Sequence, residues 1–213
     1  MRYLSIAVFV AFIFLISCRM NNQDKSHQNV PRVFENLNLY TFSSDDLNCL
    51  GKAQPFVLPP NASLRDALNS LGRHLAEKYF STTYANEPTN IHFEVVGIDR
   101  ISTPSRTLVT ATVNMIDVND AALGFFFQGS TGGQTTFCML AATFMQPHLD
   151  PPLLDGLILL HNGKLLPQLD HINLSGLLIP RLVRHAVKRA IYSTEMKAVS
   201  ATHSWQSELK FML

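Results

Sequence analysis

The chain has 213 residues, of which 46% are hydrophobic and 15% are charged. This length is enough for one domain with a sizeable core and is short for two. The formal net charge of +1 argues against a general nucleic-acid-binding protein, which would carry a strong basic excess.

The first 17 residues have the features of an export signal. Met1 and Arg2 form a short positive start, and the apolar run over 3–17 has about the length of the apolar segment of a signal peptide. The run is shorter than the roughly 20 apolar residues that span a membrane. We therefore expect residues 1–17 to be a signal peptide.

A cysteine follows this run directly. The segment 15–18, Leu-Ile-Ser-Cys, resembles the lipobox of bacterial lipoproteins, in which the cysteine is acylated and becomes the first mature residue. The resemblance implies lipidation of Cys18 and anchorage in the cell envelope, facing the periplasm or the exterior. Arg19 replaces the aspartate that often retains such lipoproteins at the inner membrane, which favours the outer membrane in a two-membrane cell. The alternative is an ordinary signal peptide, or an uncleaved anchor, that contains a cysteine.

The residues after Cys18 predict a tether. Cleavage before Cys18 removes Arg2, so the 17 basic residues fall to 16 against 16 acidic residues. The mature side-chain charge is then about zero, which leaves membrane attachment to the lipid. Residues 18–35 are polar and have no apolar period, so we expect a flexible, lipid-anchored segment there.

Two cysteines remain in the mature chain besides Cys18. Cys49 and Cys138 can form one bridge in a compartment where disulfides persist. Cys138 can equally be a small buried hydrophobic residue of a helix. No spacing forces the pair together, so the sequence favours the second interpretation.

The first half of the domain predicts a strand, a helix and a hairpin. Alternation over 36–42 predicts a strand, and the prolines that follow indicate an irregular connection. Ser63 and Asp66 form a capping box, and leucines at helical spacing predict an amphipathic helix over 64–79 with its apolar stripe in the core. Residues 91–103 and 106–118 are rich in β-branched residues and predict a hairpin. The members of the second strand expected to face the core are Val109, Ala111, Val113 and Met115.

The chain then reaches its most apolar segment. Residues 121–127 are expected to be extended, and residues 129–133 to form a flexible Gly/Ser/Thr loop. The helix that follows, up to Pro147, has almost no polar side, so it must be buried on several sides. One face of this helix carries Phe137, Leu140, Ala141 and Phe144. Much of the remaining surface is covered by Cys138, Met139, Ala142 and Met145.

The last third predicts a strand pair and a second amphipathic helix. A strand is expected over 153–160, and Asn162-Gly163 is a strong hairpin signal before a short returning arm. Pro180 is expected at the start of a basic amphipathic helix. This pattern is more typical of a helix that packs on the domain with its basic side in solvent. The alternative is a helix that lies on lipid or on an acidic partner.

The predicted elements give an α/β (α+β) domain. Its small mixed sheet has the order β-α-β-β-α-β and is packed by two helices, and a C-terminal amphipathic helix follows. Residues 36–176 resemble the GerMN domain of bacterial spore-germination and sporulation lipoproteins. The segments that carry the resemblance are Asn38-Leu39-Tyr40, TATVNMIDV (110–118), GSTGGQTTFCMLAATFMQP (129–147) and LILLHNGKLLPQLDHINLSG (157–176). Asn114 and the Asp170-His171-Ile172-Asn173 segment depart from the usual pattern of the family.

The GerMN resemblance implies a small module, related in architecture to ring-building motifs, that acts through protein contacts and is not known as an enzyme. Its partner is expected to be another envelope protein or a second copy. Residues 177–213 are expected to be the C-terminal helix and tail. The resemblance does not imply a role in germination or sporulation itself, because the departures from the family pattern are those of a distant branch of the family.

Enzyme and cofactor motifs are weak in the sequence. The loop Gly129, Ser130, Thr131, Gly132 and Gly133 lacks the spacing and the lysine of a phosphate-binding loop, so it is expected to be an interaction loop. No GxSxG motif supports a hydrolase with Ser130 as nucleophile. Residues of types that bind metals occur at His148, Asp150, Asp155, His161, Asp170 and His171. No pair of them has the i, i+4 spacing on a helix, or the CxxC pattern, of a dedicated zinc site. We expect no metal, cofactor or nucleic acid. The alternative is an envelope enzyme or ligand-binding protein with a pocket near Gly129–Gly133 and His171, in which Ser130 and His161 converge.

Overall fold

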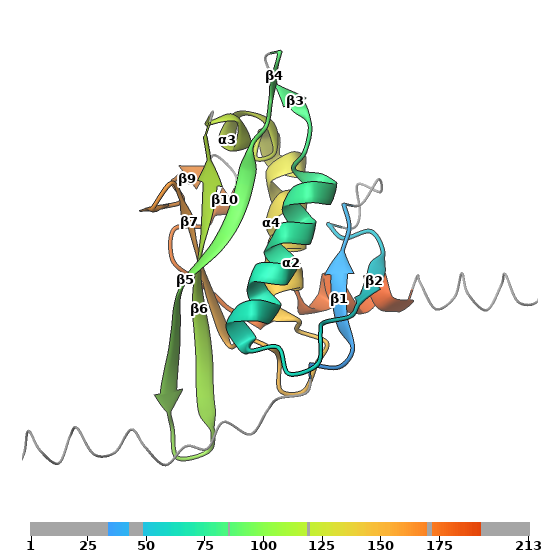
Figure 1. The fold of residues 1–213 in the computed structure, drawn as a ribbon, viewed down its shortest axis with the longest axis vertical. Helices are drawn as coiled ribbons and strands as arrows, with labels where there is room; N and C mark the ends of the chain where they lie inside the picture. Colours follow the sequence, from blue (N-terminus) through green and yellow to red (C-terminus); the bar gives the residue numbers. More distant parts are fainter. Residues whose placement is uncertain (1–33, 43–48, 85, 119, 170–171, 193–213) are drawn as a thin grey trace, which may run out of the picture. The chain divides into compact units, whose positions relative to one another are not determined.

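The computed structural model describes residues 34–42, 49–84, 86–118, 120–169 and 172–192. The predicted signal peptide, Cys18 and most of the tether lie outside this part of the chain, as do residues 170–171 and the tail from 193. These described residues form one compact unit. Its helices and strands confirm the predicted α+β class (Figure 1).

A five-stranded mixed sheet forms one layer of the domain. The strands, in spatial order, are β11 (Leu177–Leu178), β7 (Gly156–His161), β6 (Thr107–Asp117) and β5 (Ile91–Ser102). The short β8 (Lys164–Leu165) also pairs with β7. Strands β6 and β7 are parallel, and every other pair in this sheet is antiparallel. The parallel pair needs a long crossover connection, which α4 supplies.

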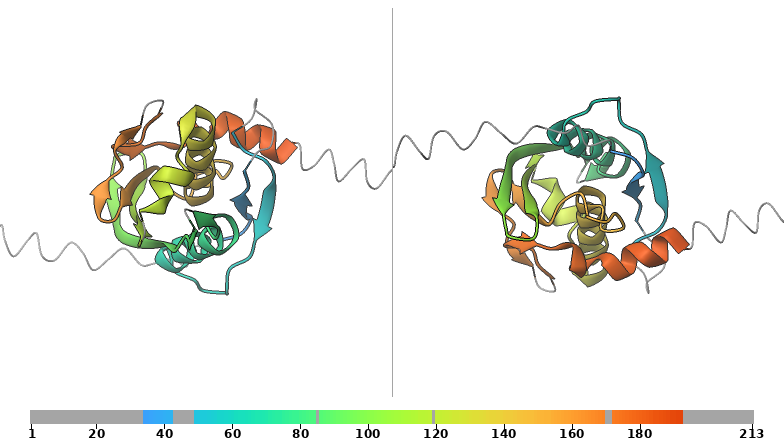
Figure 2. Two further views of the ribbon diagram at one scale, coloured as in Figure 1. Left: turned by 90° about the horizontal axis from the view of Figure 1, so that it is seen from above. Right: turned by 90° about the horizontal axis from the view of Figure 1, so that it is seen from below.

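Two helices form the second layer, α2 (Leu64–Tyr79) and α4 (Gly129–Met145). Figure 2 shows both on the same side of the sheet, with the C-terminal helix on that side as well. The predicted boundaries of α2 are confirmed, as is its capping box. The Ser63 hydroxyl accepts from the Asp66 amide at 3.2 Å, and the Asp66 carboxylate accepts from the Ser63 amide at 3.0 Å.

The hairpin β5–β6 is confirmed with its predicted inward face. The four alternate residues of β6 expected in the core, Val109 to Met115, are buried. The register shifts between Val95 and Gly97, which makes a bulge. Helix α2 compensates the bulge, because Asn69 accepts from the Val95 amide at 3.1 Å and Arg65 donates to the Val95 carbonyl.

Helix α4 is buried on most sides, as its composition predicts. Phe144 is fully buried and Phe137 is partly buried against the core. The prediction of a loop over Gly129–Gly133 is wrong, because α4 begins at Gly129. Gly129 has φ of 65°, which glycine adopts without strain, so the chain turns directly into the helix. Gly133 is buried, and its packing offsets the weak helix propensity of glycine.

The extended segment expected over 121–127 is also wrong. Residues Ala121–Phe125 form the short helix α3. The Asp117 carboxylate accepts from the Ala121 amide at 3.1 Å and so satisfies a free donor at the start of this helix. A short apolar run does not distinguish strand from helix, and here the local cap decides.

The first strand is confirmed, but it does not join the main sheet. Strand β1 (Leu37–Tyr40) pairs with β2 (Ala53–Phe56) in a separate ribbon. The sequence indicated only an irregular connection where β2 lies, because Pro55 weakens the strand signal. Proline is tolerated in an edge strand, and β2 pairs on one side only within this ribbon. Figure 2 shows the ribbon on the far side of the helices from the main sheet.

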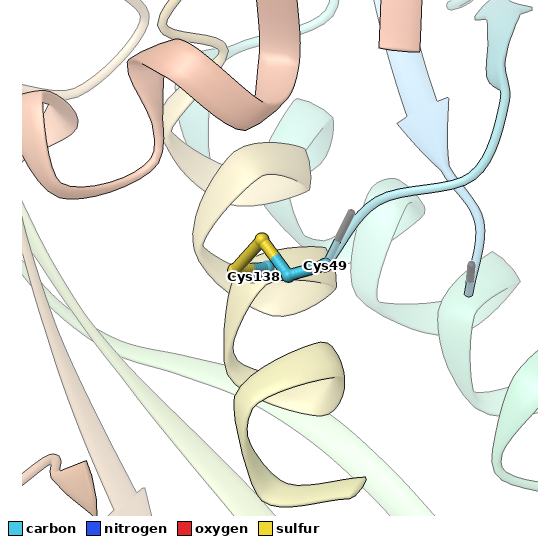
Figure 3. Close-up of a disulfide and its surroundings, with 2 residues drawn as sticks. All are labelled: Cys49 and Cys138. Carbon is cyan, nitrogen blue, oxygen red and sulfur yellow. A yellow bond between two sulfur atoms is a disulfide. The ribbon is translucent and has the colours of Figure 1, made fainter. Parts of the chain in front are cut away.

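The two mature cysteines form a disulfide, contrary to the favoured prediction. Cys49, which leads into β2, is bonded to Cys138 of α4, 89 residues further along the chain (Figure 3). Burial of Cys138 is confirmed. Spacing could not reveal the pair, because the two residues meet only when β1 and β2 fold onto α4.

The last third of the domain follows its prediction in outline. Strand β7 begins at Gly156, three residues later than expected, and Asn162-Gly163 forms the predicted turn into β8. The turn residues have φ of 49° and 78°, the left-handed values of a tight hairpin. Beyond it, η2 (Pro180–Leu182) leads into a helix over 184–192.

The predicted docking of this last helix is confirmed. Val183, Val187 and Ala190 are buried, while Arg184 and Lys188 are exposed. Two short strand pairs complete the described fold: β3 (Thr83–Tyr84) with β4 (Glu87–Pro88), and β9 (Gln168–Leu169) with β10 (Ile172–Asn173).

Candidate functional site

The outer face of the sheet is the first candidate surface. Along β7, Leu157, Leu159 and His161 are buried toward the helices, so Ile158 and Leu160 point to the opposite face. Residues that pair directly across neighbouring strands share a face. The register therefore places Leu177 beside Ile158, and Leu165 beside Leu160.

This outer face carries exposed aliphatic side chains beside polar ones, because the outward residues of β6 include Thr110, Thr112 and Asn114. Leu165 is 55% exposed, Leu177 is 56% exposed and Ile101 of β5 is 54% exposed. Within the described residues, the helices lie on the other side of the sheet (Figures 1 and 2). A set of exposed aliphatic side chains on a rigid sheet is typical of a protein contact surface.

A second candidate site lies at the carboxyl ends of the two parallel strands. Asp117 ends β6 and His161 ends β7. His161 Nε2 lies 3.2 Å from Asp117 Oδ2 and 3.7 Å from Asp120 Oδ1. The side chains of Asp117 and His161 are 0% and 10% exposed, whereas that of Asp120 is 79% exposed. The cluster is therefore built into the fold but open on one side.

The turn residue Asn162 holds this cluster in place. Its side-chain amide donates to the Asp117 carbonyl and to Asp120 Oδ1, both at 2.9 Å. Its Oδ1 accepts from the Asp117 amide at 2.8 Å. One side chain thus fixes the segment after β6 to the segment after β7. The hairpin signal at Asn162-Gly163 therefore marks a site as well as a turn.

Sequence reasoning named His161 but missed Asp117 and Asp120. The imidazole and the Asp117 carboxylate lie 44 residues apart in the chain. The signal that could have joined them is the pairing of strands, because two parallel strands bring the residues at their carboxyl ends to one edge of the sheet. The crossover through α4 makes β6 and β7 parallel, and no local spacing reports that.

Two of the other predicted polar residues, Asp155 and His148, have structural partners. Asp155 forms an ion pair with Arg106 at 2.6 Å and accepts from the Val109 amide at 2.8 Å, so it fixes the start of β7 to β6. His148 contacts the Tyr40 hydroxyl at 3.0 Å through Nδ1, and its Nε2 donates to the Asn36 carbonyl at 2.9 Å. Asp150 is exposed.

Burial shifts the ionisation of the Tyr40–His148 pair. Burial lowers the pKa of His148, an effect that the hydrogen bond to the Asn36 carbonyl partly opposes. Burial raises the pKa of Tyr40, against a smaller lowering by the Asn38 side chain. Both groups are thereby held neutral, as a structural contact between β1 and the end of α4 requires.

The pocket expected in the alternative interpretation lies only partly within the described residues. Residues Gly129–Gly133 are helical, His161 contacts Asp117, and His171 and Asp170 lie outside the described residues. The predicted lipidation site, Cys18, lies outside them too. Within the described part of the chain, no helix is long and apolar enough to cross a membrane.

Comparison with protein-family models, with curated proteins and with solved structures finds no match for this chain.

Proposed function

We propose that this protein is a lipid-anchored bacterial envelope protein whose GerMN-like domain is a non-catalytic module for binding another envelope protein or a second copy. The N-terminal apolar run and Cys18 would supply the anchor. The domain from 36 to 176 would supply the contact surface.

The disulfide supports a location outside the cytoplasm. Structural disulfides persist in oxidising compartments and are rare where thiols are kept reduced. The Cys49–Cys138 bond lies between α4 and the segment before β2, so it links the β1–β2 ribbon to the central helix. This observation is independent of the lipobox resemblance and agrees with it.

The outer face of the sheet carries the interaction proposal. Its exposed side chains, Ile101, Leu165 and Leu177, belong to three different strands of one rigid layer. Burial of apolar surface contributes about 25 cal/mol per Å², so a partner that covers this face gains affinity without any rearrangement of the core. The loop predicted for this role, Gly129–Gly133, is less suited because it is helical and partly buried.

The anchor is tested by Cys18→Ala. We expect the variant to accumulate as unprocessed precursor and to lose incorporation of a labelled fatty acid. Removal of the acylated thiol should also release the chain from the membrane fraction if the signal peptide is cleaved elsewhere. Normal acylation and maturation of Cys18→Ala would refute the lipoprotein assignment.

The interaction role is tested by a photo-crosslinking amino acid in native envelopes. We expect discrete adducts from positions Leu165 and Leu177, and none from the exposed Lys188 of the C-terminal helix. Leu177→Glu should abolish the adduct formed from position 165, because it places a charge in the same contact. Equal labelling from all three positions, or none from the sheet, would count against this face as the interface.

A further inference from the structure

Asp117, Asp120 and His161 form a cluster of three possible metal ligands and not only a hydrogen-bonded pair. These three donors offer one imidazole nitrogen and two carboxylate oxygens, all within 4.8 Å of one another. They come from the ends of β6 and β7 and from the turn between β6 and α3. Imidazole and carboxylate ligands together are typical of zinc sites.

The two distances from the imidazole to the carboxylates suit one metal ion. Bonds from zinc to nitrogen or oxygen are about 2.0–2.2 Å long, so neighbouring ligand atoms of a tetrahedral site lie about 3.3–3.5 Å apart. The separations of His161 Nε2 from the two carboxylate oxygens, 3.2 Å and 3.7 Å, bracket this value. Asp120 is the exposed member, so its side of the cluster leaves a path for the ion and for a water ligand.

The position of the imidazole also suits a shared ion. The nitrogen Nε2 of His161 lies close to both carboxylates and carries at most one proton, so it donates to only one of them. A divalent ion bound by the Nε2 lone pair would contact both carboxylates at once.

The surroundings orient the donor atoms as metal sites require. Asp117 Oδ1 is occupied by the Ala121 amide, which leaves Oδ2 directed at His161. The amide of Asn162 fixes Asp120 Oδ1. Such second-shell hydrogen bonds hold ligands in place and raise metal affinity.

We propose that Asp117, Asp120 and His161 form a zinc-binding site at the carboxyl edge of the β6–β7 pair, with solvent completing the coordination. The ion would join the segment after β6 to the β7–β8 turn. It would lie apart from the outer sheet face, so the proposal is independent of the interaction function.

The test uses the full chain purified from membranes in detergent and stripped with a chelator. Addition of Zn²⁺ should raise the Tm, and calorimetry should show one strong site per chain. Addition of Co²⁺ should give the visible absorption of a low-symmetry nitrogen- and oxygen-ligated ion. Asp120→Asn should weaken binding of both ions by roughly tenfold or more, since loss of even an outer-shell partner costs 10–100-fold.

Two features keep this test decisive. Asp120→Asn retains the oxygen that accepts from Asn162, so the fold is kept. Asp99→Asn removes an exposed carboxylate from the far part of β5 and should leave affinity unchanged. Absence of a zinc-dependent rise in Tm would overturn the proposal, as would equal affinity of Asp120→Asn and the unchanged protein. An equal loss in both variants would mean non-specific surface binding and would overturn it as well.

Discussion

At Gly72, helix α2 passes so close to the sheet and to α4 that no side chain fits. A Cβ atom added there would lie 2.8 Å from the Cβ of Phe93 and 3.5 Å from the ring of Phe144. Replacement of glycine by alanine inside a helix normally raises the free energy of unfolding by about 1 kcal/mol. Here we expect overpacking to dominate and to cost about 1–3 kcal/mol of unfolding free energy, measured by chemical denaturation.

Helix α4 supplies the matched control. A Cβ at Gly132 would lie 3.8 Å from the Phe126 carbonyl, an ordinary contact, and the residue is exposed. Gly132→Ala should therefore stabilise the protein by about 0.5–1 kcal/mol. The same substitution in two helices is expected to change stability in opposite directions. A stabilising Gly72→Ala would show that α2 does not approach the sheet this closely.

His148 makes stability depend on pH. Burial lowers its folded-state pKa below the unfolded value of about 6.5, so the unfolded chain binds the extra proton first. Stability from this group is fully present above about pH 6.5 and is lost as the pH falls from there through the folded pKa. We expect the Tm to fall over this range and the β1 contacts to weaken.

Two variants separate this effect from other titrating groups. His148→Gln should have a lower Tm at neutral pH but a flatter dependence on pH below 6.5. Tyr40→Phe should keep most of the wild-type dependence, because it leaves the burial of His148, the main cause of the shift, in place. Identical pH profiles of Tm for His148→Gln and the wild type would exclude His148 as the source.

At the level of elements, strand β1 pairs with β2 on one edge and is held on its other edge by side chains of α4 and its C-cap. Gln146, at the left-handed end of α4, accepts from the Asn38 amide at 2.8 Å and donates to the Asn38 carbonyl at 2.7 Å. The Thr143 hydroxyl accepts from the Tyr40 amide at 3.2 Å. The side-chain amide of Gln146 thereby makes the two hydrogen bonds to Asn38 that the backbone of a neighbouring strand would otherwise make.

Gln146→Ala should release this strand. Each buried polar group left without a partner costs about 1–3 kcal/mol, so we expect a loss of roughly 2–4 kcal/mol. Amide hydrogen exchange should accelerate in β1 and β2 while β5, β6 and β7 remain protected. Gln134→Ala, an exposed change on the same helix, should alter neither. Uniform loss of protection across both sheets would contradict the local role of Gln146.

The elements that the sequence predicts well are those whose signal is local. Helix α2 has a capping box and an apolar stripe over 16 residues, and the β5–β6 hairpin has two long β-branched runs. The wrong predictions, at 121–127 and Gly129–Gly133, concern short or glycine-rich segments. Their conformation is set by tertiary contacts such as the one between Asp117 and the Ala121 amide.

At the scale of the whole molecule, the features that the sequence does not predict are those that join distant segments. Asp117 and His161 meet because β6 and β7 are parallel, and Cys49 reaches Cys138 because the β1–β2 ribbon folds onto α4. Residue types drew attention to His161 and to both cysteines. Pairing them required the topology, because neither contact has a characteristic spacing in the chain.

The disulfide should stabilise the domain as a whole, because it links the ribbon layer to the central helix. Closing a loop of 89 residues removes conformational entropy from the unfolded chain, and loss of such a bond typically costs about 2–5 kcal/mol. We expect Cys49→Ala/Cys138→Ala to lose stability by this amount in denaturant titrations. Reductant should lower the stability of the wild type toward that of the double variant and should leave the variant unchanged.

The same bond links stability to the compartment in which the protein folds. Protein isolated from the envelope should resist thiol alkylation at Cys49 and Cys138 until it is denatured and reduced, and mass spectrometry should then show two added groups. A chain that lacks residues 1–17 and is made in a reducing cytoplasm should be alkylated at both positions after denaturation alone, and it should melt at a lower temperature. Free thiols at Cys49 and Cys138 in envelope-derived protein would remove the support that the disulfide gives to export, because the bond would then play no part in the native state.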